Sequence, residues 1–143
     1  MFKDIKSLDC TLRDGGYYNR WDFNSELAQE YIAAMDAAGV DIIEIGFRSL
    51  INEGYKGAVA YTSDEFLEGL KIPVGMSIGV MVNGSELACQ DAQEADLCSL
   101  FPLPADKARF SLVRIACHAH EFKDVLPAAN WLKNRGYQVG FNL

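Results

Sequence analysis

The sequence predicts an α/β fold of the barrel type, in which parallel strands alternate with helices. Strand-like apolar segments recur, and the first four begin roughly 35 residues apart. Helix-like segments lie between them, which favours parallel pairing through crossover connections. Each strand also has one apolar face and one small or polar face, whereas an open sheet covered by helices on both sides needs two apolar faces.

Composition places the chain among soluble globular domains. Its 143 residues are 50% hydrophobic and 23% charged, and the net charge is −7. No Lys or Arg cluster offsets this charge, which argues against nucleic acid or an anionic membrane as a partner. The N-terminal charges argue against a signal peptide, and no apolar run reaches membrane-spanning length. The four cysteines lie far apart without CxxC spacing, so we expect reduced thiols and a cytoplasmic location.

The opening strand is predicted at residues 8–12 and ends at a charged pair. Arg13 and Asp14 follow it directly, and the two glycines after them allow a tight turn or a close approach to a ligand. If alternation continues to position 13, Asp9, Thr11 and Arg13 share one face. The alternative is a solvated turn that carries a surface ion pair.

A helix is predicted after this strand. Asn24 or Ser25 can cap its first turn, and Gly39 ends it. Apolar side chains recur on one helical face between these points. They are Leu27, Tyr31, Met35 and Ala38.

The second strand is predicted at residues 40–47, and a long loop follows at 48–61. Loops of this length at the edge of a sheet often carry function. Thr62-Ser63-Asp64-Glu65 then has capping-box spacing ahead of a short helix. A third strand is predicted at residues 74–82.

The rest of the chain continues the alternation. A helix is predicted within residues 85–99, and Pro102 and Pro104 mark an irregular stretch. The fourth strand is predicted at residues 111–118. A helix is predicted at residues 121–135 and ends at Gly136, and the fifth strand is predicted at residues 137–143.

The polar faces of the five predicted strands carry side chains that are costly to bury without a purpose. In a barrel these faces turn inward and meet near the carboxyl ends of the strands. The alternative is an interior ion-pair network that only fixes the strand register. The side chains are Asp9, Thr11, Arg13, Glu44, Ser77, Asn83, Arg114, His118 and Asn142.

Several motifs resemble one enzyme superfamily. They are Thr-Leu-Arg-Asp-Gly at 11–15, Ile-Glu-Ile-Gly at 43–46, Val-Arg-Ile-Ala-Cys-His at 113–118 and Gly-Phe-Asn-Leu at 140–143. Together they resemble the DRE-TIM metallolyases, above all the 4-hydroxy-2-oxovalerate aldolases; 3-hydroxy-3-methylglutaryl-CoA lyase and the isopropylmalate and homocitrate synthases are relatives. The resemblance implies that residues 1–143 form the N-terminal part of one (β/α)8 TIM-barrel catalytic domain, with about four strand–helix units and a fifth strand.

The resemblance also implies a lyase reaction and roles for individual residues. Asp14 matches the ligand of a divalent metal, Mn2+ or Mg2+ in the aldolases and Zn2+ in some relatives. Arg13 matches the arginine that faces the 2-oxo oxygen of the substrate, and Glu44 matches the acidic residue that holds this arginine. The implied reaction cleaves a 4-hydroxy-2-oxo acid to pyruvate and an aldehyde. We expect Arg114 and Asn142 to bind the substrate.

The chain departs from the aldolase pattern at its histidines. Where the aldolases have a catalytic base three residues after the metal aspartate, this chain has Tyr17, which can transfer protons if its pKa is lowered. The family's His-x-His metal pair belongs to the sixth strand, whereas His118-Ala119-His120 ends the fourth. We therefore expect His118 to contact the substrate, or alternatively to be satisfied by hydrogen bonds in the barrel wall.

Length sets further expectations. A complete barrel needs about 250 residues, so we expect a longer polypeptide or another chain to complete it, with a homo-oligomer as one possibility. Residues 1–143 alone should bind metal weakly and turn over little. Two other functions stay open, a Claisen-type acyltransferase of the isopropylmalate or homocitrate synthase kind and a noncatalytic barrel or half-barrel that binds a ligand or partner.

Overall fold

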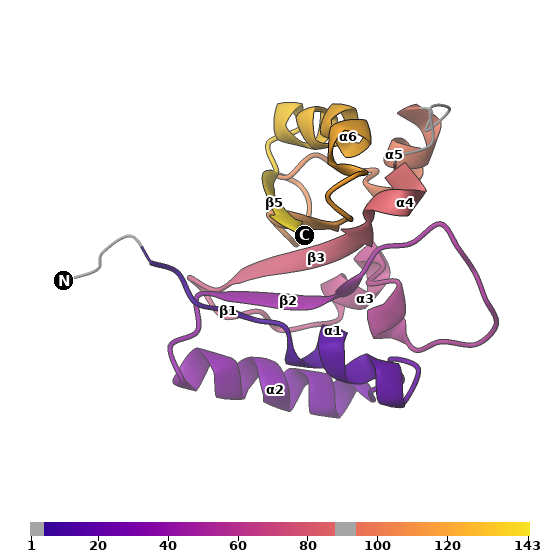
Figure 1. The fold of residues 1–143 in the computed structure, drawn as a ribbon. Helices are drawn as coiled ribbons and strands as arrows, with labels where there is room; N and C mark the ends of the chain where they lie inside the picture. Colours follow the sequence, from indigo (N-terminus) through magenta and orange to yellow (C-terminus); the bar gives the residue numbers. More distant parts are fainter. Residues whose placement is uncertain (1–4, 88–93) are drawn as a thin grey trace.

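The computed structural model describes residues 5–87 and 94–143. Five parallel strands form one sheet whose spatial order follows the chain (Figure 1). Because each strand pairs with the next one in sequence, the sheet is half of a barrel, which confirms the predicted fold class. The strands are β1 (Leu8–Asp9), β2 (Ile42–Phe47), β3 (Ser77–Asn83), β4 (Leu112–Ala116) and β5 (Gln138–Asn142).

Helices connect the strands. In Figure 1, α2 lies beside β1 and β2 and α6 lies beside β5. Within residues 5–87 and 94–143, no helix has the length and apolar character needed to cross a membrane. The helices are α1 (Thr11–Gly15), η1 (Gly16–Tyr18), α2 (Ser25–Ala37), η2 (Ala58–Ala60), α3 (Asp64–Glu68), α4 (Gly84–Leu87), α5 (Glu94–Leu100) and α6 (Phe122–Asn134).

The opening segment differs from the prediction, because β1 is two residues long and α1 begins at Thr11. The side chain of Asp9 accepts a hydrogen bond from the backbone N–H of Thr11 at 2.9 Å, a local contact that favours a turn over further strand. Asp9 also accepts a hydrogen bond from the Tyr31 hydroxyl of α2, on the helix side of the sheet. The predicted inward face of Asp9 and Thr11 is therefore wrong.

Helix α2 begins and ends as predicted. The side chain of Asn24 accepts a hydrogen bond from the N–H of Leu27 at 2.7 Å, and Gly39 follows the helix with φ at +73°. Its buried residues, however, are Ala28 and Ile32, whereas Leu27 is 45% exposed. The packed face is thus centred on Ala28 and Ile32, and the predicted Tyr31 and Met35 are partly buried against the core beside them.

A bulge in β2 changes which side chains face inward. It lies between Glu44 and Gly46, so that Ile45 is an extra residue relative to β3. An extra residue shifts the alternation of side chains by one position. Phe47 therefore lies on the same face as Glu44, whereas strict alternation predicted the opposite face.

The apolar side of the sheet packs against the helices and forms the core. Val113 and Ile115 are fully buried, and they alternate with the half-buried Leu112, Arg114 and Ala116. This pattern confirms the two different faces predicted for the fourth strand. Other fully buried members of the core include Ile43, Ile45, Val80, Val82, Phe101, Val125 and Leu132.

The other elements lie close to their predicted positions. Ser63, within the predicted capping segment, caps α3. β3 begins at Ser77, three residues late, since Gly75 occupies a turn with φ at +98°. The helix predicted within 85–99 corresponds to α4 and α5, and its residues 88–93 lie outside the described residues.

Candidate functional site

Glu44 is the centre of a charged cluster on the inner face of the sheet. Its side chain is 0% exposed. Oε1 accepts a hydrogen bond from Nε of Arg13 at 2.8 Å, and Oε2 accepts one from Nη1 of Arg114 at 3.0 Å. Charge-assisted bonds of this kind are stronger than neutral ones. A single buried carboxylate therefore fixes two guanidinium groups, one from α1 and one from β4.

Arg13 has a second anionic neighbour. Its Nη1 donates to Oδ1 of Asp14 at 3.0 Å, and the Asp14 side chain is 66% exposed. Burial acts to lower the pKa of Arg13, but the charge and hydrogen bond of Glu44 outweigh it and raise that pKa. Arg13 is thus held as a fixed cation at the edge of the cluster.

The cluster continues to β5. Nη2 of Arg114 donates to Oδ1 of Asn142 at 3.1 Å. Gly140 lies opposite Arg114 in the register, and a Cβ there would come within 3.3 Å of the arginine Cγ. The sheet thus brings together five residues that the sequence analysis assigned to the site: Arg13, Asp14, Glu44, Arg114 and Asn142.

Trp21 holds the backbone of Arg13 in place. Its indole N–H donates to the Arg13 carbonyl oxygen at 2.7 Å. A Cβ at Gly16 would lie 1.9 Å from an indole carbon, and a Cβ at Gly57 would lie 2.1 Å from the Trp21 carbonyl oxygen. Only glycine fits at these two positions. Trp21 was not among the predicted site residues, because nothing in the sequence indicates its contacts with Gly16 and Gly57.

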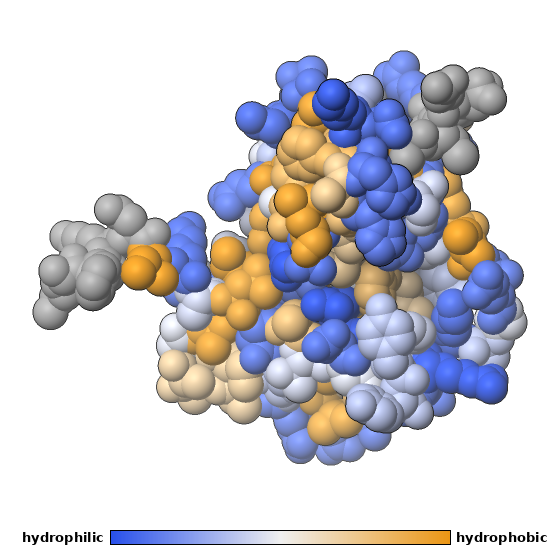
Figure 2. Space-filling view, in the orientation of Figure 1, coloured by the Kyte–Doolittle hydropathy of each residue, from blue (hydrophilic) through white to orange (hydrophobic). Residues whose placement is uncertain are grey.

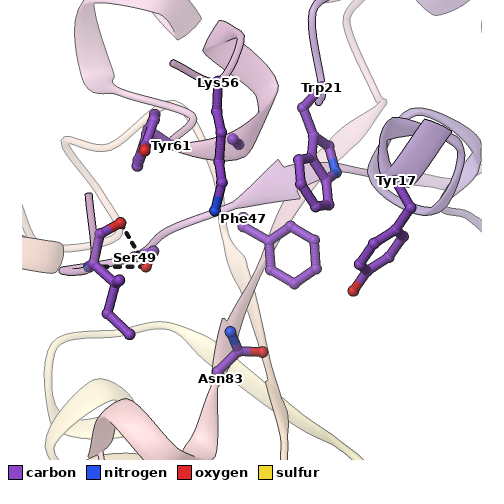
Figure 3. Close-up of a pocket in the computed structure, with 9 residues that line it drawn as sticks. Tyr17, Trp21, Phe47, Ser49, Lys56, Tyr61 and Asn83 are labelled. Carbon is purple, nitrogen blue, oxygen red and sulfur yellow. Dashed lines mark hydrogen bonds between the residues drawn. The ribbon is translucent and has the colours of Figure 1, made fainter. Parts of the chain in front are cut away.

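A pocket of about 220 Å3 opens beside the cluster (Figure 3). The rings of Tyr17, Trp21 and Phe47 meet edge to face, with centroids 4.7 to 6.3 Å apart. The guanidinium carbon of Arg13 lies 5.7 Å from the Phe47 centroid. The pocket therefore adjoins the charged cluster. The lining residues are Tyr17, Trp21, Phe47, Ser49, Ile51, Lys56, Ala60, Tyr61 and Asn83.

No family model matches this chain, but known proteins are similar to it. An oxaloacetate decarboxylase of Mycobacterium tuberculosis is 26% identical over 95% of the chain and 38% of its own length. A 4-hydroxy-2-oxovalerate aldolase of Mycobacterium marinum is 30% identical over 82% of the chain and 32% of its own length. The crystal structure of the N-terminal domain of a "putative aldolase" from Bacteroides vulgatus matches 96% of the chain and 44% of that structure, with a TM-score of 0.83 and 35% identity.

The chain is a distant homologue of these aldolases. The homology confirms the resemblance predicted from the motifs, and the solved domain confirms the half-barrel. The chain spans about a third of the length of the curated relatives that it matches.

In this aldolase homologue, the predicted residue His118 lies outside the pocket that Tyr17 lines. It is exposed after β4, and its ring stacks on that of His120 with centroids 5.5 Å apart. It lines a second pocket of about 330 Å3 together with Asn83 and Asn142. Both predicted roles of His118, contact with the substrate and hydrogen bonding in the barrel wall, stay predictions.

Asp14 is the metal ligand predicted for this homologue. Within the described ranges, no three His, Cys, Asp or Glu side chains are placed to hold a metal ion together. Asp14 offers one exposed carboxylate, and one of its oxygens already binds Arg13. The described residues therefore do not form a complete metal site.

Proposed function

We propose that this chain supplies the enolate-stabilising half of a carbon–carbon lyase that cleaves a 4-hydroxy-2-oxo acid to pyruvate and an aldehyde. The observation that carries the proposal is the fixed position of Arg13, whose side chain is bound by buried Glu44 and whose backbone is bound by Trp21. Homology to 4-hydroxy-2-oxovalerate aldolases supports this choice of reaction.

In the proposed reaction, the 4-hydroxyl group loses its proton and the bond between carbons 3 and 4 breaks before pyruvate forms. A base takes the proton of the 4-hydroxyl group, whose oxygen becomes the aldehyde carbonyl, and the bond between carbons 3 and 4 breaks. The electron pair of that bond forms an enolate on carbon 3 and the 2-oxo oxygen, and protonation of carbon 3 gives pyruvate. Arg13 stabilises the enolate oxygen as its charge develops, because a preorganised cation needs no reorganisation at that moment.

The other predicted residues take supporting roles in this proposal. Glu44 is a positioning residue, since it acts through the two arginines that it holds. We assign Arg114 and Asn142 to the substrate carboxylate. Proton transfer is assigned to Tyr17, which lines the pocket that adjoins Arg13, and His118 lines the pocket that Asn142 also lines.

Arg13→Lys tests the proposal. Lysine keeps the charge beside Glu44 but loses the planar fork of donors, so we expect kcat for cleavage of 4-hydroxy-2-oxo acids to fall about 100-fold while the fold is retained. Pyruvate release by the full-length protein measures the rate, and circular dichroism checks the fold.

Arg109→Lys is the matched control, because the guanidinium of Arg109 bonds to the Leu70 carbonyl oxygen, and neither residue belongs to the charged cluster. Unchanged cleavage in Arg13→Lys would contradict the proposal. Free-thiol release on addition of acetyl-CoA would instead favour the Claisen-type acyltransferase.

A further inference from the structure

Lys56 brings a positive charge to the aromatic pocket. Figure 3 shows its side chain reaching from the long loop toward Phe47, with the ammonium group on the Ser49 and Tyr61 side of the Phe47 and Trp21 rings. Its Nζ lies 5.8 Å from the Trp21 ring centroid. Its ion pair with Glu53 is 3.8 Å long, and the Glu53 side chain is 72% exposed. Pairs of that kind contribute little, so the ammonium group is available to an anionic ligand.

The two cations of this region are separated by aromatic rings. The Arg13 guanidinium carbon lies 5.7 Å from the Phe47 centroid, the Phe47 and Trp21 centroids are 5.7 Å apart, and Nζ of Lys56 follows at 5.8 Å from Trp21. A ligand that spans this row meets a cation, an apolar aromatic wall and a second cation.

Polar side chains surround the Lys56 end of the pocket. Ser49 and Tyr61 line the wall there, and Asn83 lies below Phe47 in Figure 3. The side chain of Lys56 itself is only 27% exposed. A carboxylate bound there would be partly shielded from water, and shielding strengthens a charge-assisted hydrogen bond.

We propose that this pocket binds the distal part of the substrate, the part that becomes the aldehyde, and that Lys56 binds an acidic group at its far end. The substrate class is then a 2-oxo acid with a flat or apolar middle and a second carboxylate. Lys56 is the specificity-determining residue for that carboxylate. The inference rests on the proposed function, which places the 2-oxo group at Arg13.

Benzoate and benzamide test the assignment of Lys56, because they share a shape and differ in charge. Calorimetry on the purified protein should show benzoate binding about tenfold more tightly than benzamide. Lys56→Met should abolish that preference and leave benzamide binding unchanged, which also shows that the pocket is intact. Lys56→Arg should restore the preference.

The matched control is Lys123→Met, which removes the same charge from the exposed surface of α6 and should keep the preference for benzoate. Absence of benzoate binding, equal affinity for the two probes, or a preference that survives in Lys56→Met would overturn the assignment. Pyruvate is measured in parallel. Pyruvate binding that is unaffected by Arg13→Lys contradicts the proposed function, whereas a benzoate preference unaffected by Lys56→Met contradicts the assignment of Lys56.

Discussion

The two halves of the inner face differ in how firmly their polar groups are held. Beside β2, Glu44 is fully buried and holds Arg13 and Arg114 at 2.8 and 3.0 Å. At the ends of β4 and β5, His118 and Asn142 are exposed to solvent. Figure 2 shows hydrophilic residues gathered in the middle of the face in view, with apolar surface above and to the left. The groups around Glu44 are thus preorganised by their mutual hydrogen bonds, whereas the side chains of His118 and Asn142 lie at the surface of the described part of the chain.

The largest effect is expected for Glu44→Ala. This change leaves two guanidinium groups beside each other without the carboxylate that both bind, so the free energy of unfolding should fall by about 3–5 kcal/mol. Urea denaturation measures the loss. Asn142→Ala, on the β4–β5 half, should cost less than about 1 kcal/mol. Equal losses in the two variants would contradict the difference between the halves.

A smaller effect is expected for alanine in place of a glycine on each half. A Cβ at Gly46 would lie 2.0 Å from the carbonyl oxygen of Val59, and backbone cannot move aside cheaply, so Gly46→Ala should cost about 1–3 kcal/mol. A Cβ at Gly140 would lie 3.3 Å from the Cγ of Arg114, a contact that a small shift of one side chain relieves. Gly140→Ala should therefore cost less than Gly46→Ala in the same denaturation experiment, and the reverse order would show that the β4–β5 half is the tighter one.

The smallest effect concerns acid stability on the helix side of β1. Burial acts to raise the pKa of Asp9, but the hydrogen bonds from Tyr31 and Thr11 lower it below 3.8 overall. A folded pKa below the unfolded one adds stability above about pH 4 that is lost as the pH falls through the folded pKa. Tyr31→Phe should reduce that loss by about 1 kcal/mol or less. Urea midpoints measured from pH 6 down to about pH 2.5 check this, and an unchanged pH dependence would contradict it.

The strand–helix alternation and the central ion pair could both be predicted from the sequence. Apolar periodicity places β2 to β5 and both long helices within a few residues, because their packing repeats a simple pattern. The bond between Arg13 and Glu44 agrees with the role that the resemblance to the DRE-TIM metallolyases implied for Glu44. The solved relative and the register of the sheet agree with this organisation.

The features that escaped prediction depend on single local contacts. The hydrogen bond from Thr11 to Asp9 ends β1 early, and the extra residue Ile45 turns Phe47 inward; neither changes the apolar pattern of the sequence. The aromatic pocket escaped for a similar reason. Trp21 and Lys56 come from loops, where no periodicity indicates which side chains will meet.

Trp21 joins two segments that are far apart in the sequence. Its indole lies against Gly16 and binds the Arg13 carbonyl oxygen, and its own backbone lies against Gly57 in the long loop. Displacing either segment would disturb Trp21, so we expect the first turn after β1 and the long loop to move together. In a variant with Trp131 replaced by phenylalanine, the fluorescence emission of Trp21 would then report on the position of both segments.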